Sequence, residues 1–176
     1  MINFATYWDP MRHAISRAHH TEQANWEELI TTTLKQKGTK LADYSEVLQN
    51  CIRMFTSETI KGIKLKRLKS NIDIGGLTIR LNPELSLFDG DIMHVVKFYY
   101  SKHLPMTRLA AQQAIALMDV GFGISSDVRY YVFDVYSGKV FKASGLQKAS
   151  LEKAALNSIA YISLIEDHID TQSKSA

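Results

Sequence analysis

A cluster of basic residues near the middle of the chain is the first feature that could do chemistry. Five cationic side chains fall within nine consecutive residues that contain no acid, although the formal net charge of the whole chain is only +3. Such a cluster can neutralise phosphate groups of DNA or RNA and release their counterions. It can equally form a solvated connector, because the apolar residues between the cations suggest an amphipathic strand. The candidate nucleic-acid-binding residues are Lys61, Lys64, Lys66, Arg67 and Lys69.

Glu84 and Lys97 form the second candidate site, because a predicted hairpin brings the two side chains together. If Asp89 and Gly90 form the two-residue turn of that hairpin, Glu84 lies diagonal to Lys97 on one face. The Cβ atoms of such a diagonal pair are about 7 Å apart. As an ion pair on an exposed surface, the two residues would contribute about 0–1 kcal/mol. The same polar surface is predicted to include Arg80, Asn82 and Ser86.

The order of predicted elements around this pair resembles the PD-(D/E)XK nuclease fold, over about residues 40–143. The motif residues are Asn82-Pro83-Glu84-Leu85 on one strand and Val95-Val96-Lys97 on the next, with a helix and another strand following. The resemblance implies that Glu84 matches the first acid of the family, which helps to hold a divalent metal. It also implies that Lys97 matches the lysine that positions or activates the attacking water.

Val95 stands where the family has its second acid, and this departure bears on catalysis. Metal-assisted hydrolysis of a phosphodiester needs several hard oxygen ligands for Mg²⁺ or Mn²⁺. Our leading hypothesis is therefore a catalytically inactive nuclease-like core, with no cofactor expected, that binds nucleic acid or a protein partner. The alternative is an active Mg²⁺- or Mn²⁺-dependent nuclease that uses Glu84 and Lys97, with Glu84 as metal ligand and a second carboxylate not yet placed. Further residues that could complete such a site are Glu46, Glu28, Gln112 and Gln113.

The histidines and the single cysteine are weaker candidates. His13, His19 and His20 lie close together in sequence, but no acid or cysteine stands beside them at metal-ligand spacing. His94 falls on the apolar face of its predicted strand, which indicates a histidine buried in the core. Cys51 falls on the apolar face of a predicted helix, which indicates core packing rather than a nucleophile.

Hydrophobic periodicity predicts the elements that position these residues. Apolar spacing of three to four residues indicates helices in the first third of the chain, and the period changes to two in the middle. An additional strand near Ile72 is a further option. The fold class is therefore α+β (mixed α/β), with N-terminal helices, a central sheet built from two hairpins with an intervening helix, and a long C-terminal helix. The predicted helices cover about residues 9–20, 21–38, 44–55, 107–118 and 146–169, and the predicted strands cover 77–87, 91–100, 129–136 and 139–143.

Composition indicates an ordinary globular protein. The chain has 176 residues, of which 45% are hydrophobic and 22% charged, enough for a substantial core. One domain is predicted over residues 1–170, followed by a flexible polar tail at 171–176. The single cysteine fits a reducing compartment, no apolar run reaches about 18 residues, and the N-terminus lacks a signal-peptide pattern. A cytoplasmic protein without a membrane partner is therefore expected.

Overall fold

Four helices and two sheets make up the described part of the chain, which confirms the predicted α+β class. The structure, a computed structural model, describes residues 7–19, 25–57, 60, 62–64, 68–74, 77–123, 126–143, 153 and 156–157. The helices are α2 (Asp9–Ala18), α3 (Trp26–Leu34), α4 (Thr39–Thr56) and α5 (Arg108–Phe122). The strands are β1 (Ile63–Lys64), β2 (Ser70–Ile74), β3 (Leu77–Leu81), β4 (Leu85–Asp89), β5 (Ile92–Tyr99), β6 (Val128–Asp134) and β7 (Lys139–Lys142).

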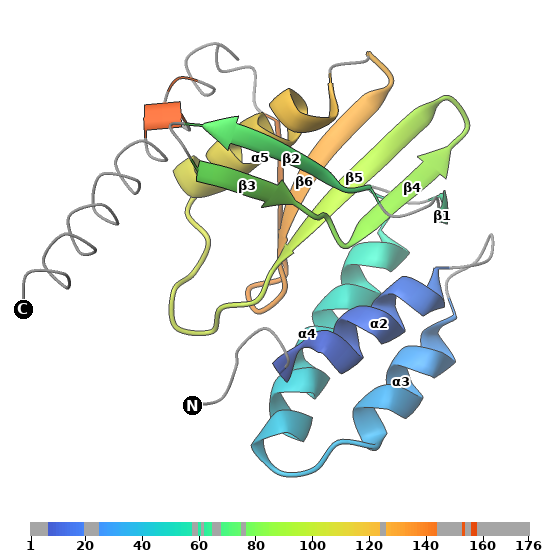
Figure 1. Ribbon diagram of the computed structural model, residues 1–176. Helices are drawn as coiled ribbons and strands as arrows, with labels where there is room; N and C mark the ends of the chain where they lie inside the picture. Colours follow the sequence, from blue (N-terminus) through green and yellow to red (C-terminus); the bar gives the residue numbers. More distant parts are fainter. Residues whose placement is uncertain are drawn as a thin grey trace, which may run out of the picture.

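The larger sheet has five strands in the order β1-β4-β5-β6-β7 (Figure 1). β4 and β5 form one antiparallel hairpin, and β6 and β7 form another, as the sequence predicts. The two hairpins meet where β5 and β6 pair in parallel. Parallel neighbours require a long crossover connection, and α5 supplies it. The helix predicted between the hairpins is therefore the element that joins them into one sheet.

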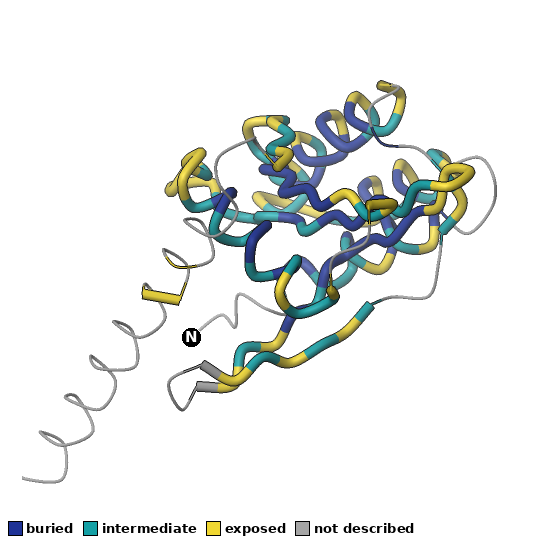
Figure 2. The backbone as a smooth tube through the Cα atoms, turned by 90° about the horizontal axis from the view of Figure 1, so that it is seen from above, coloured by how far each residue is buried: buried dark blue, intermediate teal, exposed yellow. Residues whose placement is uncertain are grey.

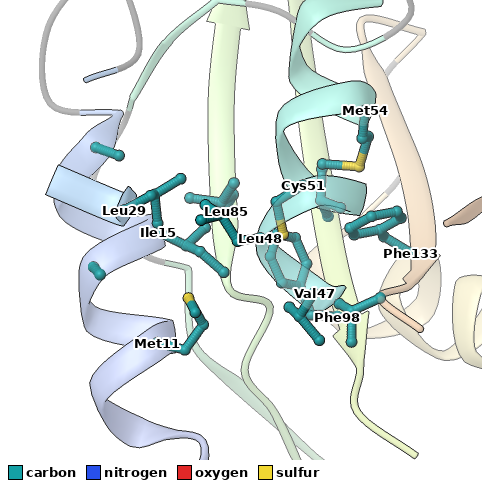
Figure 3. Close-up of a cluster of buried hydrophobic side chains, with 14 of the residues drawn as sticks. Met11, Ile15, Leu29, Val47, Leu48, Cys51, Met54, Leu85, Phe98 and Phe133 are labelled. Atoms are coloured by element: carbon teal, nitrogen blue, oxygen red, sulfur yellow. The ribbon is translucent and has the colours of Figure 1, made fainter. Parts of the chain in front are cut away.

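Helices cover both faces of this sheet, so its central strands are buried on two sides. On one face, α2 and α4 pack against the strands, and Figure 3 shows Ile15 of α2 and Leu48 of α4 meeting around Leu85 of β4. On the other face, α5 packs against Val95 of β5 and Val132 of β6. A strand between two helical layers has no face left for solvent, whatever its sequence pattern.

The prediction of one strand over residues 77–87 is wrong, because the chain breaks its pairing at Pro83. β3 ends before this proline and β4 begins after it, and the two strands belong to different sheets. Proline has no backbone N–H to donate to a ladder, which favours a break at this position. Glu84 and Ser86 are buried beyond the break, with 5% and 1% of their surface exposed. The predicted polar surface from Arg80 to Ser86 therefore does not form.

The turn of the first hairpin lies one residue later than predicted. Asp89 pairs with Ile92, so Gly90 and Asp91 form the two-residue loop. Gly90 has a φ of 63°, a left-handed conformation that glycine adopts without steric cost. Glycine at the first loop position is typical of a type II′ turn, which suits the twist of a hairpin. The observed pairing of Asp89 with Ile92 replaces the predicted pairing of Phe88 with Asp91, so each strand is one residue longer at the turn. The register changes by two residues in total, and every side chain of the hairpin therefore keeps its predicted face.

The smaller sheet is a two-stranded ribbon of β2 and β3 that runs along one side of the molecule, apart from the main sheet (Figure 2). β2 is the additional strand that the sequence suggests near Ile72. Asn71 pairs with Arg80, and Ile72 lies on the opposite face of the ribbon. Ile72 and Leu81 lie against Gly121 of α5, where a side chain in place of the glycine hydrogen would collide with Leu81. The apolar face of the ribbon therefore rests on α5, and its polar face is exposed.

Helix boundaries differ from the predicted ones by up to about one and a half turns. α4 begins at Thr39 rather than near residue 44. Gly38, predicted to end the preceding helix, instead comes directly before α4, with a φ of 65°. No helix in the described ranges combines the length and the apolarity of a membrane span. The predicted C-terminal helix and polar tail lie outside the described residues, except for residues 153, 156 and 157, which are helical.

Thr107 caps the helix that joins the two hairpins, and we expect its loss to weaken the fold measurably. Its side-chain oxygen accepts the backbone N–H of Ala110 at 3.2 Å, which satisfies one of the first unpaired N–H groups of α5. Thr107→Ala should lower the free energy of unfolding by about 1 kcal/mol in urea titrations. Thr107→Ser retains the cap and should cost much less. Equal losses in the two variants would contradict a capping role.

Candidate functional site

Glu84 lies immediately before β4, opposite Lys97 of β5. The register of the hairpin pairs Leu85 with Val96, and the Glu84 N–H donates to the Val96 carbonyl at 3.0 Å. The Lys97 Nζ lies 3.0 Å from Glu84 Oε1, so the structure brings the two predicted site residues into contact. Only 4% of the glutamate side chain is exposed, against 38% of the lysine side chain. The predicted pairing of Glu84 with Lys97 is therefore present, but the prediction that it lies on an exposed surface is wrong, because the carboxylate is buried.

Two further groups hold the Glu84 carboxylate. The backbone N–H of Phe98 donates to Oε2 at 2.7 Å. Arg12, on α2, places its Nε 3.7 Å from Oε1, and its guanidinium lies 5.0 Å from the centre of the Tyr100 ring. Sequence reasoning missed Arg12, because it belongs to a distant helix and no spacing pattern links it to the hairpin. One buried carboxylate thus connects α2 to both strands of the hairpin.

Tyr100 contributes an aromatic ring to this cluster rather than a charge. Burial raises the pKa of its phenol well above the ordinary value, and the neighbouring Glu84 carboxylate acts in the same direction. The phenol therefore stays protonated at any physiological pH. Its ring face attracts the Arg12 guanidinium through the cation–π interaction.

The residues around Glu84 do not fit a divalent metal of the kind that the nuclease resemblance implies. Both carboxylate oxygens already accept a hydrogen bond, one from Lys97 and one from Phe98. Val95, at the position of the second acid, is fully buried in the apolar layer beneath α5. Two cations, Arg12 and Lys97, lie near one carboxylate, which disfavours a third positive charge.

The other residues proposed to complete a metal site take part in different contacts. Glu46 Oε2 lies 3.8 Å from the Nζ atom of Lys102. Glu28 Oε1 lies 2.6 Å from the Nε atom of Arg17. Gln112 donates its side-chain N–H to the carbonyl of Lys142 on β7. Within the described ranges, no group of three or more His, Cys, Asp or Glu side chains is placed to hold a metal ion.

The basic cluster is only partly within the described residues, and its two described lysines have different roles. The Lys64 ammonium donates to both the carbonyl and the hydroxyl of Ser16 on α2, at 2.7 and 2.8 Å. Lys64 is therefore a half-buried link between β1 and α2. Lys69 is exposed, just before β2. The remaining predicted nucleic-acid-binding residues, Lys61, Lys66 and Arg67, lie outside the described residues.

Lys69 shares a hollow of about 510 Å³ with polar residues of the ribbon. Arg80 adds a second cation, and no acid occurs among the described residues that line the hollow. The hollow adjoins the Glu84 site, because the Asn82 carbonyl accepts from Lys97 Nζ at 3.3 Å. We call this lining the cationic hollow, and it consists of Lys69, Ser70, Asn71, Arg80 and Asn82. The grouping of Lys69 with Arg80 follows from the pairing of β2 with β3, which periodicity alone does not specify.

The histidines that the structure describes do not gather into a site. His13 is exposed whereas His19 is buried, so they lie on different sides of the α2 region, and His20 lies outside the described residues. His94 is buried as predicted and stacks on Tyr131, and burial lowers its pKa. Cys51 is also a core residue as predicted, and burial raises the pKa of its thiol. The cationic hollow is therefore the stronger candidate for binding.

Comparisons with known proteins assign no family to this arrangement. No family model matches the chain, and neither the search of curated proteins nor the search of solved structures found a match. The resemblance to the PD-(D/E)XK fold thus stays a prediction from the sequence. Function must be inferred from the residues themselves.

Proposed function

We propose that this chain is a nuclease-like domain that does not catalyse hydrolysis and that binds nucleic acid. The observation that carries the proposal is the cationic hollow, whose described lining combines two cations with amide and hydroxyl groups. Lysine, arginine, serine and asparagine are among the side chains that contact phosphate and sugar. An anionic polymer is the ligand that such a lining favours.

The position of the hollow supports a role for the basic cluster as well. Lys69 belongs to both, because it ends the cluster and lines the hollow. In the sequence, Lys69 follows Lys66 and Arg67 by three and two residues. Contacts of such cations with phosphates bring affinity and salt dependence, with little sequence preference.

The contacts of Glu84 support the non-catalytic part of the proposal. A divalent metal needs several hard oxygen ligands, and no group of three or more His, Cys, Asp or Glu side chains in the described ranges is placed to supply them. Here Lys97 and the Phe98 N–H occupy one oxygen each, and Arg12 lies beside them. This arrangement suits a group that stabilises the fold.

Binding should be measured by fluorescence anisotropy with short labelled single-stranded and duplex oligonucleotides across a salt series, with Mn²⁺ present. We expect micromolar affinity that weakens steeply as salt increases. The double variant Lys69→Ala/Arg80→Ala should bind roughly tenfold more weakly. The slope of its log affinity against log salt concentration should be smaller by about one to two, because one to two fewer counterions are released. The matched control is Lys35→Ala/Lys37→Ala, which removes the same charge from exposed positions between α3 and α4. It should bind like the wild type.

Two outcomes would contradict the proposal in different ways. Absence of binding at low salt would reject nucleic acid and leave a protein partner as the alternative. A signal that decays with time in Mn²⁺ would indicate cleavage, and the Mg²⁺- or Mn²⁺-dependent nuclease would then replace the non-catalytic domain.

A further inference from the structure

We propose that the β2–β3 ribbon enters the major groove of duplex DNA, where Asn71 and Arg80 contact the edges of the bases. This inference rests on the proposed function and narrows it to one class of nucleic acid. Its support comes from the shape of the ribbon, from the side chains on its exposed face and from the way α5 holds it.

The ribbon has dimensions that a major groove accepts. Its two strands of five residues are paired along their whole length. At a rise of about 3.3 Å per residue the ribbon is about 15 Å long, and with strands about 4.8 Å apart it is narrow. The major groove of B-form DNA is about 12 Å wide and admits a two-stranded ribbon.

Asn71 and Arg80 are the two side chains that suit base recognition. They are directly paired across the ribbon, and both are exposed. Paired residues on one face have Cβ atoms about 5 Å apart, so the two side chains can reach adjacent base pairs. Arginine forms two hydrogen bonds with the O6 and N7 atoms of guanine, and asparagine forms two with the N6 and N7 atoms of adenine.

The neighbouring residues fit the same orientation. Continuing the register places Lys69 opposite Asn82, on the same face as the Asn71–Arg80 pair. Lys69, at the base of the ribbon, is placed to meet a phosphate at the rim of the groove. Asp73, towards the turn, accepts a hydrogen bond from Thr78, which occupies one of its oxygens. Positive charge is therefore concentrated in the half of the ribbon nearest the main sheet.

The ribbon is held in place by its apolar face. Leu81 and Ile72 contact α5 at Gly121, and Leu81 is almost fully buried. A surface that is already ordered loses less conformational entropy on binding than a loop does. The pair of base-contacting residues is therefore presented by a preformed element.

The test compares a labelled B-form DNA duplex with an RNA duplex of the same sequence and with a DNA duplex in which 7-deazaguanine replaces guanine. The RNA major groove is too narrow for side chains to read, so DNA should bind about tenfold more tightly. 7-Deazaguanine keeps the phosphates and the Watson–Crick pairs but lacks the N7 acceptor. It should weaken wild-type binding about fivefold or more. Arg80→Ala should abolish this sensitivity, whereas Lys69→Ala, which removes a cation that faces the phosphates, should retain it.

The outcomes separate this inference from the proposed function. Equal binding of the DNA and RNA duplexes, without a 7-deazaguanine effect, would overturn the groove inference and leave binding through phosphates intact. A preference for single strands would overturn it as well. If no oligonucleotide binds, the proposed function itself fails.

Discussion

Glu84→Ala should lower the free energy of unfolding by about 3 kcal/mol. The substitution removes the acceptor of the Phe98 N–H, which is buried, and deprives Lys97 and Arg12 of their shared anion. Loss of a buried hydrogen bond costs about 1–3 kcal/mol. Removing one partner of a buried ion pair costs about 3–5 kcal/mol. The expected value lies between these, because both cations are partly exposed and can regain water.

A double-mutant cycle would show whether the carboxylate acts through its partners. Glu84→Gln keeps an oxygen for the Phe98 N–H and should cost less than Glu84→Ala. Lys97→Met removes the closest cation but keeps most of its apolar stem. The cost of the double variant Glu84→Gln/Lys97→Met should be smaller than the sum of the single costs by about 1 kcal/mol or more. Strict additivity in urea titrations would contradict the coupling.

Acid should destabilise this protein through the buried imidazole of His19. Burial, together with the nearby charge of Lys64, lowers the pKa of His19 from 6.5 to about 4. Between these two values the unfolded chain binds a proton that the folded chain excludes, so stability falls as the pH falls. The loss begins near pH 6.5, is complete near pH 4 and amounts to about 3 kcal/mol.

His19→Phe should flatten this pH dependence, because phenylalanine suits the contacts of the imidazole with Phe55 and Trp26 and carries no proton. Urea unfolding at several pH values between 7 and 4 measures the slope, which is informative even where the variant is less stable. His94, whose pKa burial also lowers, should leave a residual dependence of the same sign. His13→Gln, at an exposed position, serves as the control. An unchanged slope in His19→Phe would contradict the role of His19.

The sequence predicts the strands and faces of the hairpin more reliably than it predicts which of its side chains other elements bury. Alternation assigns Glu84 and Lys97 to one face, and this assignment holds despite the later turn because the shift preserves parity. The burial of Glu84 could not be predicted in the same way. It depends on α2 lying over the end of the sheet, and tertiary packing of this kind leaves no periodic signal in the hairpin itself.

Pro83 carries a signal that periodicity alone overlooks. It occupies an apolar position in the alternating pattern, so residues 77–87 have the pattern of one strand. The missing N–H is a local signal for a break, and the break allows β3 to leave the main sheet and pair with β2. The cationic hollow exists because of that departure, since in one continuous strand Arg80 would share a face with Glu84, about 13 Å further along, instead of pairing with Asn71 of β2. Its composition is visible in the sequence, but its assembly requires the pairing of β2 with β3.

The parallel pairing of β5 with β6 has a consequence for how the chain folds. The described N-terminal helices α2, α3 and α4 are synthesised first, yet the face that they bury is completed by strands that follow, including Phe133 of β6. β5 cannot gain its parallel neighbour until α5 has been made, because α5 is the connection between them. Contacts between residues far apart in the sequence form slowly, because closing the loop between them loses entropy before the contact contributes favourable free energy. During synthesis β4 and β5 can cover only part of the apolar side of the helical layer, and its cover is complete only after the ribosome has passed β6.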